Sequence, residues 1–440
     1  MSAEESYNRD EGQRVNFRSS IFLNHFVRHV SRWGTIVLLI IIVWGCGAVP
    51  TIKEGSEGNY VRLPFVRVLL AGGSSDMTIA GNKSVSVECV RAGKNLVYYA
   101  SQPVTVRFDK GSLSVTMRGS RIGDRFDEVL ITPRSKDGLL SYNNVSYRGM
   151  FKIIPDGRTL DLINIVHLDD YLKGVVPPEI GWVGEPEFEA IKAQAVAART
   201  YSMSHLLQYP DKPYDMKSDV SDQLYHGVDV EKPLVSKAID ETRGFVIKYG
   251  DEMINAYYHS TCGGYTDDID EVWDKKAAPY LRAVNDSEFC AWSKYYNWKE
   301  TYTAGQLKMR IEEYMSSERG RVIKIGDITD IYIKSYTPGG RIFELTVQTE
   351  QGNYDLGRDK IRWVFKRSSN PEMILQSARF KVNVNKNANG KVETIELVGG
   401  GYGHGVGMCQ CGAIGMSRSG RQFKNILTFY YSNTNVVKLY

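Results

Sequence analysis

The feature that most constrains this chain is a glycine-rich segment near its C-terminus, residues 399–413. Seven of its first fourteen residues are glycine. Glycine loses more backbone entropy on folding than any other residue, so such a run disfavours the interior of a helix or strand. It predicts backbone that approaches a ligand or another chain closely. His404, Cys409, Gln410 and Cys411 lie within the segment, which predicts the wall of a site. A tight, close-packed turn would explain the same glycines.

Length and charge limit the function classes open to this chain. Its 440 residues can bury a large core and form one to three domains. A net charge of +4 is small for this length and argues against a dedicated nucleic-acid-binding protein. The glycine-rich segment contains no lysine, whereas a phosphate-binding loop needs Gly-Lys-Ser/Thr before a helix. We therefore expect no nucleic-acid partner.

The N-terminal region predicts a membrane anchor at residues 33–50. No charged residue occurs between Trp33 and Ile52. Several arginines precede this stretch, and no acidic residue lies between Glu11 and Trp33. That asymmetry predicts a cytoplasmic tail at residues 1–32 and export of everything after the anchor. The apolar core is short for a spanning helix of about 20 residues. The sequence before Cys46 also resembles a lipoprotein cleavage box. The anchor could therefore be either a single-pass helix or a lipid attached to Cys46. The flanking arginines disfavour a buried core helix.

Beyond the anchor, residues 51–59 read as a short polar linker. Short runs then alternate apolar and polar residues, and turn residues such as those at Asp109-Lys-Gly111 separate the runs. This spacing predicts a strand-rich module over residues 60–145, followed by a domain over residues 146–440. The clearest strand candidates are 61–70, 84–90, 104–108, 113–117 and 129–131.

The first clear helix is predicted from Glu187 to about Leu207. Phe188, Ile191 and several alanines recur at helical spacing on one face, and the alanines permit close packing. We expect a buried central helix in an α+β fold that is otherwise rich in strands.

Just before this helix, Glu179 follows Pro177 and Pro178 at the end of an apolar run. The two prolines predict a turn at this point, because proline is disfavoured inside helices and sheets. A carboxylate held rigidly in apolar surroundings is suited to act as a general acid. From the residues alone, a solvated loop glutamate is the competing interpretation.

Four motifs follow one another along the chain: Val175-Val-Pro-Pro-Glu179, Lys192-Ala-Gln-Ala-Val-Ala-Ala-Arg-Thr-Tyr201, Tyr258-His-Ser-Thr-Cys-Gly-Gly264 and Gly403-His-Gly-Val-Gly-Met-Cys-Gln-Cys-Gly-Ala413. Together they resemble the SpoIID/LytB family, which comprises the stage II sporulation protein D lytic transglycosylases of peptidoglycan and the amidase enhancer proteins. The resemblance covers roughly residues 60–440 and is strongest at 146–205, 244–266 and 357–440. At positions 409–411 this chain has Cys-Gln-Cys where family members often have Ser-Gln-Trp or Cys-Gln-Trp.

The resemblance implies cleavage of the MurNAc-β-1,4-GlcNAc bond in glycan strands, here expected to be peptide-free, to give 1,6-anhydro-MurNAc ends. In this family the motif glutamate, which maps onto Glu179, is the general acid and base, and the chemistry needs no cofactor. Motif membership makes five residues candidate substrate contacts: Gln194, Arg199, Tyr201, His404 and Gln410. Arg199 has an alternative role as a brace that pairs with a carboxylate. The alternative function is a glycan-binding protein that does no chemistry and activates a cell-wall amidase.

Five cysteines follow the anchor. An exported location permits disulfides, but because five is an odd number, at least one cysteine must remain unpaired within the chain. His259, Cys262 and Cys290 offer ligand types that suit zinc. Some family members are understood to hold zinc near this region, so the resemblance raises a structural zinc ion. A Cys262–Cys290 disulfide and free thiols are the two alternatives. Cys409 and Cys411 point in opposite directions if the chain is extended, so they are poorly placed to bond each other.

Overall fold

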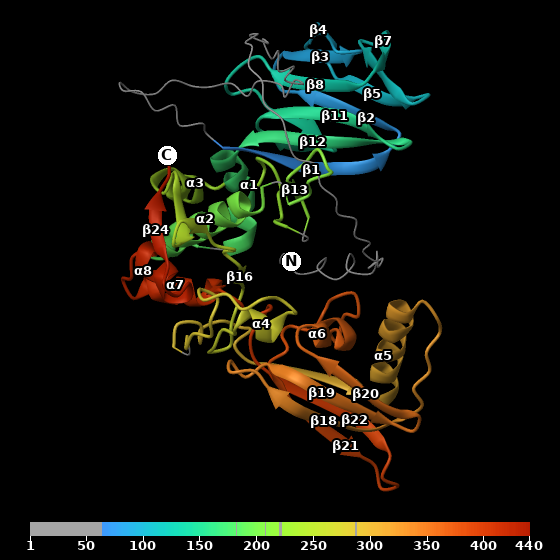
Figure 1. Cartoon of the computed structure of the whole chain (residues 1–440), viewed down its shortest axis with the longest axis vertical. Coiled ribbons are helices and arrows are strands. Elements are labelled where there is room, and N and C mark those ends of the chain that lie inside the picture. The colour runs from blue at the N-terminus through green and yellow to red at the C-terminus, as the bar shows by residue number, and fades with distance from the viewer. Residues whose placement is uncertain (1–63, 182, 207, 220–221, 287) are drawn as a thin grey trace, which may run out of the picture.

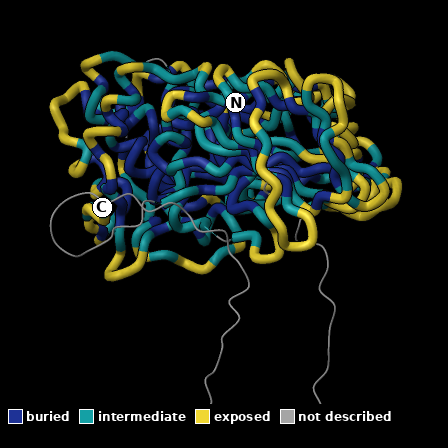
Figure 2. Tube along the Cα trace, turned by 90° about the horizontal axis from the view of Figure 1, so that it is seen from above, coloured by how far each residue is buried: buried dark blue, intermediate teal, exposed yellow. Residues whose placement is uncertain are grey.

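The computed structural model describes residues 64–440, except 182, 207, 220–221 and 287 (Figure 1). These residues form the strand-rich α+β fold that the sequence predicts. The predicted tail, anchor and linker at residues 1–59 lie outside the described residues. In the part of the chain that the structure describes, no helix is both long and apolar enough to cross a bilayer. Seen from above, buried segments run through the interior and exposed residues gather at the turns (Figure 2).

Two sheets form the upper part of the molecule in Figure 1. One has seven strands in the order β13-β1-β12-β11-β8-β3-β4, and the other has six in the order β10-β9-β2-β5-β6-β7. The alternating pattern behind the prediction is visible in β3, where Val85, Val87 and Cys89 are buried and their neighbours are not. The five predicted strand runs are confirmed from residue 65 onward. The strands are β1 (Phe65–Ser74), β2 (Asp76–Gly81), β3 (Val85–Arg91), β4 (Lys94–Ala100), β5 (Val104–Asp109), β6 (Ser112–Met117), β7 (Ser120–Phe126), β8 (Glu128–Pro133), β9 (Leu140–Tyr142), β10 (Val145–Tyr147), β11 (Met150–Asp156), β12 (Thr159–His167) and β13 (Met216–Lys217).

A layer of helices packs below these sheets around α2 (Phe188–Ser204), which confirms the predicted central helix. Five of its alanines are buried, and their small side chains let neighbouring helices approach closely. It packs against α1 (Leu168–Ile180), α3 (Pro233–Glu241), α7 (Gln410–Arg418) and α8 (Phe423–Tyr430). Short elements complete this layer: η1 (Glu185–Glu187), β14 (Phe245–Tyr249), β15 (Glu252–Met253), β16 (Tyr258–His259), α4 (Ile269–Val272), β23 (Met408–Cys409) and β24 (Asn435–Lys438).

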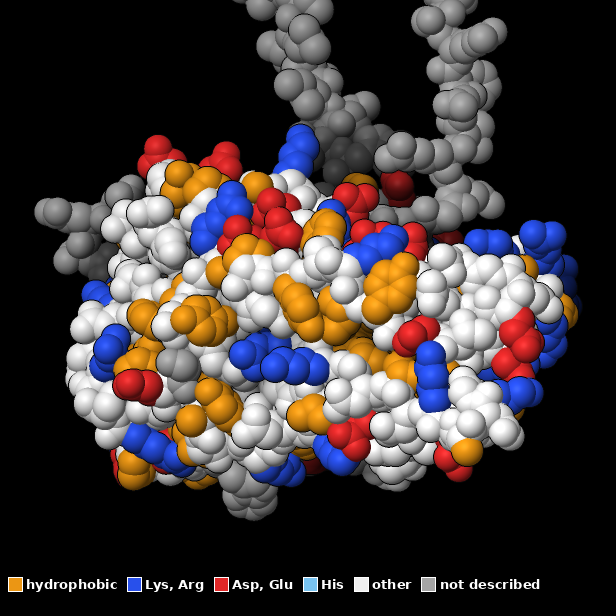
Figure 3. Space-filling view, turned by 90° about the horizontal axis from the view of Figure 1, so that it is seen from below, with side chains coloured by type: hydrophobic (Ala, Val, Ile, Leu, Met, Phe, Trp, Pro, Cys, Tyr) orange, Lys and Arg blue, Asp and Glu red, His pale blue; other side chains and the backbone are white. Residues whose placement is uncertain are grey.

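A second hydrophobic core lies in residues 298–399, which we call the inserted unit. It falls between two of the motifs and within the range 146–440 that the sequence assigns to one domain. Two three-stranded sheets build it, in the orders β17-β22-β21 and β18-β19-β20. Seen from below, acidic and basic side chains intermingle on the face in view, in keeping with the small net charge (Figure 3). Its elements are β17 (Trp298–Thr303), α5 (Ala304–Arg319), β18 (Ile328–Tyr336), β19 (Ile342–Thr349), β20 (Gly352–Gly357), α6 (Lys360–Phe365), β21 (Phe380–Lys386) and β22 (Val392–Gly399).

Candidate functional site

Glu179 lies in the last turn of α1, so the prediction that the prolines place it in a turn outside regular structure is wrong. The helix continues through Pro177 and Pro178, although each lacks the N–H that would bond the carbonyl four residues earlier. Pro178 has no N–H for the carbonyl of Gly174, and that carbonyl instead accepts a hydrogen bond of 3.2 Å from the backbone of His226. The prolines thus fix the position of Glu179 from within a helix.

Two tyrosines lie near enough to Glu179 for its charge to act on them. Its Oε1 atom is buried, while the residue as a whole is half-buried. Burial raises the pKa of Tyr258 and of Tyr171 well above the usual range, and the charge of Glu179 adds to both shifts. Gln223 holds both phenols: its Nε2 donates to the Tyr258 hydroxyl at 3.0 Å, and its Oε1 accepts from the Tyr171 hydroxyl at 3.3 Å. The phenols on which the charge of Glu179 acts are therefore neutral and fixed in position.

The last two motifs meet through a short parallel pairing of β16 with β23, in which Tyr258 lies opposite Met408. His404 reinforces this pairing. Its Nδ1 accepts a hydrogen bond of 3.0 Å from the backbone of Val406, so its Nε2 carries the proton and donates to the Tyr258 carbonyl at 3.0 Å. The His404 ring also lies 4.8 Å from the ring of Trp273. The structure thus gives His404 a positioning role beside Tyr258.

Gln194 and Gln410 meet where α2 packs against α7. Nε2 of Gln410 donates to Oε1 of Gln194 over 3.5 Å, and both side chains are buried. Tyr201, one turn further along α2 than Ala197, is half-buried and stacks on His205 with ring centroids 3.9 Å apart. These residues line the interior around the motifs.

Arg199 is fully buried, which contradicts a direct contact with substrate. Its Nε donates to Oδ1 of Asp169 at 2.9 Å, and its two terminal nitrogens donate to the carbonyls of Phe245 and Ile239. Asp169 lies in the first turn of α1, the helix that ends at Glu179. Arg199 therefore braces α1 against α2, the alternative role that the sequence left open.

The glycine-rich segment approaches another part of its own chain closely, in keeping with the close-packed alternative. Gly405 has φ +87°, and a Cβ there would lie 2.0 Å from Cζ of Arg341. Arg341 belongs to the inserted unit and is almost fully buried. Its guanidinium donates at 3.0 Å each to a carboxylate oxygen of Asp267 and to the carbonyls of Tyr265 and Cys262. Sequence reasoning missed this residue, because no motif or spacing marks it.

Gly405→Ala should destabilise the protein more than Gly420→Ala. Both glycines have positive φ, +87° and +84°, so alanine pays a backbone cost of roughly 1–2 kcal/mol at each. No described heavy atom lies within 4 Å of a Cβ at Gly420, whereas Arg341 blocks the one at Gly405. Urea unfolding of the two variants measures the difference. Equal losses would mean that Arg341 yields without cost.

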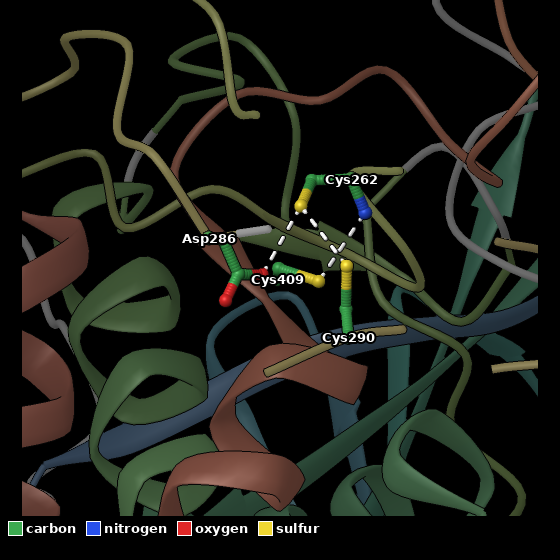
Figure 4. Close-up of side chains that lie close together, drawn as sticks. All are labelled: Cys262, Asp286, Cys290 and Cys409. Carbon is green, nitrogen blue, oxygen red and sulfur yellow. Dashed lines mark hydrogen bonds between the residues drawn. The ribbon is translucent and has the colours of Figure 1, made fainter. Parts of the chain in front are cut away.

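Four buried side chains form a compact cluster of potential metal ligands: Cys262, Asp286, Cys290 and Cys409 (Figure 4). Their ligand atoms all lie within 4.8 Å of one another. Sγ of Cys262 is 3.4 Å from Sγ of Cys290 and 3.1 Å from Oδ2 of Asp286. The structure does not place the predicted ligand His259 in this group. The Nδ1 atom of His259 donates to the carbonyl of Val406 at 3.2 Å. Cys409 and Asp286 complete the set in its place.

The electrostatics of the cluster suit a bound cation. Burial raises the pKa of Cys262 and Cys409, while hydrogen bonds from these two thiols lower that of Cys290. Oδ1 of Asp286 is buried and has no hydrogen-bond partner among the described residues. Three sulfurs and a carboxylate are donors that zinc accepts in tetrahedral sites, where Zn–S is about 2.3 Å. The residues present therefore fit a zinc ion, and all five cysteines in the described part of the chain carry free thiols.

Two family models match parts of this chain. SpoIID, described as stage II sporulation protein, matches residues 156–249, which contain the Glu179 motif and α2. A domain of unknown function, DUF8618, matches residues 288–407, which contain the inserted unit.

Curated relatives extend the similarity beyond the first model. An uncharacterised protein of Brachyspira hyodysenteriae is 31% identical over 327 residues, 72% of this chain and 80% of the relative. The amidase enhancer of Bacillus subtilis is 30% identical over 304 residues, but the match spans only 40% of that protein and 60% of this one. The stage II sporulation protein D of Bacillus subtilis is 28% identical over 299 residues, 64% of this chain and 78% of the relative. Together with the motifs and their assembly around Glu179, these matches show that the chain belongs to the SpoIID family.

Proposed function

We propose that this protein is a lytic transglycosylase that cleaves the MurNAc-β-1,4-GlcNAc bonds of peptide-free glycan strands. The observation that carries the proposal is the position of Glu179, fixed at the end of α1 with one carboxyl oxygen buried beside Tyr171 and Tyr258. Membership of the SpoIID family supports a substrate in the cell wall.

A single carboxyl group suffices for this reaction. Glu179 donates its proton to the glycosidic oxygen as the bond from that oxygen to C1 of MurNAc breaks. The C6 hydroxyl of the same MurNAc then attacks C1, and its proton passes to Glu179, which regenerates the acid. Ordinary glycosidases need a second carboxylate because they must activate water or form a covalent intermediate. The neutral phenols beside Glu179 add no negative charge that would oppose its deprotonated form.

The location follows from the N-terminal sequence. We propose that residues 33–50 anchor the protein in a membrane, as a single-pass helix or through a lipid on Cys46, with the catalytic part outside the cytoplasm. The glycan strands of the envelope would then be within reach, and a cell-wall amidase that removes their peptides would be a natural partner.

A second candidate function is activation of such an amidase without any cleavage of glycan. The observation that favours it is the 30% identity with a protein named amidase enhancer. Retention of a glutamate at position 179 in its motif favours the enzyme.

Product analysis separates the candidates. The purified full chain is incubated with peptide-free glycan strands, and the products are identified by mass spectrometry. We expect 1,6-anhydro-MurNAc ends, which are 18 mass units (one water) lighter than hydrolysis products. Reducing ends would instead indicate a hydrolase. Absence of products from these strands, together with faster peptide release by an amidase from peptide-bearing peptidoglycan when the chain is added, would favour the activator.

We further propose that Cys262, Asp286, Cys290 and Cys409 hold a structural zinc ion. When bound, the ion supplies a cross-link between the loop that carries Cys262 and the start of α7, where Cys409 is the N-cap. Three backbone N–H groups already point at the sulfurs: Gly264 at that of Cys262, and Cys262 and Gly412 at that of Cys409. Such outer contacts orient metal ligands and offset their charge.

Replacing one ligand should release the metal and lower stability. We expect about one zinc per chain in the wild type, and less than a tenth of that in Cys290→Ser, by elemental analysis. A ligand present at about a hundred times its Kd stabilises a protein by roughly 2.7 kcal/mol, so the unfolding temperature should also fall. The control is Cys411→Ser, because Cys411 lies outside the cluster and accepts a hydrogen bond from Thr261. A metal-free wild type, or equal metal in both variants, would contradict the proposal.

A further inference from the structure

Two buried polar atoms beside the cysteine cluster have no hydrogen-bond partner among the described residues. They are Oδ1 of Asp286 and the hydroxyl oxygen of Tyr430. Both residues are fully buried, so water does not reach these atoms from the surface. Burying a polar group without a hydrogen bond is unfavourable, and each exception in a folded protein needs a reason. Two such atoms beside a set of metal ligands point to a shared role.

Gly412 on α7 leaves the space between these two side chains open. A Cβ at this position would lie 2.0 Å from the Tyr430 hydroxyl oxygen, and 2.2 and 2.7 Å from Oδ2 and Oδ1 of Asp286. All three distances are shorter than real Cβ atoms show, so any larger residue would displace one of the two side chains. Both polar groups therefore face the same small space, and the fourth motif needs a glycine at this position.

The two carboxylate oxygens of Asp286 have different surroundings. Oδ2 lies 3.1 Å from Sγ of Cys262, on the side of the sulfurs, whereas Oδ1 points away from them (Figure 4). Where a carboxylate binds a metal, it is itself hydrogen-bonded by an outer residue that fixes its orientation. This geometry makes Oδ2 the ligand atom and leaves Oδ1 as the acceptor for an outer donor.

We propose that the Tyr430 hydroxyl is this donor, and that it fixes Asp286 as the fourth ligand by a hydrogen bond to Oδ1. The inference rests on the zinc ion proposed above. Three thiolates and a carboxylate carry more negative charge than a zinc ion neutralises, so the ligands need donors around them. Backbone N–H groups already serve the sulfurs of Cys262 and Cys409. A tyrosine hydroxyl keeps its proton at neutral pH and can serve the carboxylate. Tyr430 is thus a positioning residue, which acts on the metal through Asp286.

The zinc affinity of the full chain tests this role. The metal is removed, and the Kd for zinc is measured by competition with a colorimetric chelator. We expect Tyr430→Phe to raise the Kd about 10–100-fold, as the loss of an outer contact to a metal ligand does. The matched control is Tyr431→Phe, because Tyr431 is equally buried but its hydroxyl donates to the carbonyl of Tyr257 at 2.8 Å. Its Kd should stay within about threefold of the wild type, since no ligand loses an outer contact.

Urea unfolding of the metal-free chains supplies a readout that a merely structural tyrosine would not give. Tyr430→Phe removes a buried hydroxyl that has no partner, so its unfolding midpoint should equal or exceed that of the wild type. Tyr431→Phe breaks a buried hydrogen bond, so its midpoint should fall. The two variants should therefore rank in opposite orders in zinc affinity and in metal-free stability.

Three results would overturn the role of Tyr430: a zinc affinity of Tyr430→Phe equal to that of the wild type, an equal loss of affinity in both variants, or a lower metal-free midpoint of Tyr430→Phe. The zinc ion and the role of Tyr430 fail separately. If the wild type binds no zinc, the ion itself is wrong and the role of Tyr430 falls with it. If the wild type binds zinc and Tyr430→Phe binds it equally well, only the role of Tyr430 is wrong.

Discussion

Glu179→Gln is expected to lower the rate of formation of 1,6-anhydro ends by at least about 10²–10⁴-fold, the usual contribution of a positioned general acid. Glutamine preserves the size and the hydrogen-bonding outline of the side chain but can neither give the leaving oxygen a proton nor take one from the C6 hydroxyl. The measurement is the initial rate of anhydro-end formation from peptide-free strands by mass spectrometry. The folded structure should be unchanged, because the residue is half-buried at a helix end and outside the main core.

Glu185→Gln is the matched control for this prediction. Glu185 lies six residues further along the chain, is exposed, and begins η1. Its substitution removes the same charge from the same region and should leave the rate within about twofold. If Glu179→Gln cleaves at the wild-type rate, another group is the acid. If both variants lose activity equally, the loss reflects the charge of the region and not proton transfer.

The sequence predicted the strands and α2 because their signals are local. Alternation such as that in β3 follows from one buried face, and α2 shows the helical period with small residues that permit close contact. Its prediction for Glu179 failed for a reason that is not local. Prolines are expected to break a helix, but the N–H of His226 satisfies the carbonyl of Gly174, which Pro178 leaves open. A partner 52 residues away in the chain gives no signal in the local pattern.

The sequence named candidate members of the site but gave no information on their contacts. Motif membership proposed Glu179, Gln194, His404 and Gln410, whereas the contacts depend on long-range pairings such as that of β16 with β23. The same pairing brings Cys409 to Cys262, and Asp286 joins them from a loop that no motif covers. Spacing in the sequence favoured His259, which the fold turns toward the carbonyl of Val406. The predicted ligand set contains His259, and the observed set contains Cys409 and Asp286 instead. This difference arises from long-range topology, which single residues do not encode.

Arg341→Met is expected to lower the free energy of unfolding by about 3–5 kcal/mol, because it leaves the buried carboxylate of Asp267 without its charged partner. Asp267 and Arg341 are 0% and 2% exposed, so water cannot replace the lost pair. The variant also loses the hydrogen bonds to the carbonyls of Tyr265 and Cys262, which join the inserted unit to the loop behind the cysteine cluster. Urea unfolding followed by tryptophan fluorescence gives the free energy.

The control is Arg121→Met on β7, which breaks exposed ion pairs of 2.9 Å to Asp109 on β5 and 3.1 Å to Asp124 on β7. Exposed pairs contribute only about 0–1 kcal/mol, so this variant should unfold almost as the wild type does. Equal, small losses in the two variants would contradict the view that Arg341 locks the inserted unit to the site. A large loss confined to Arg341→Met, with a slower rate of cleavage, would support it. The inserted unit would then be part of what holds the glycine-rich wall in place, since Gly405 can approach so closely only where Arg341 is anchored by Asp267.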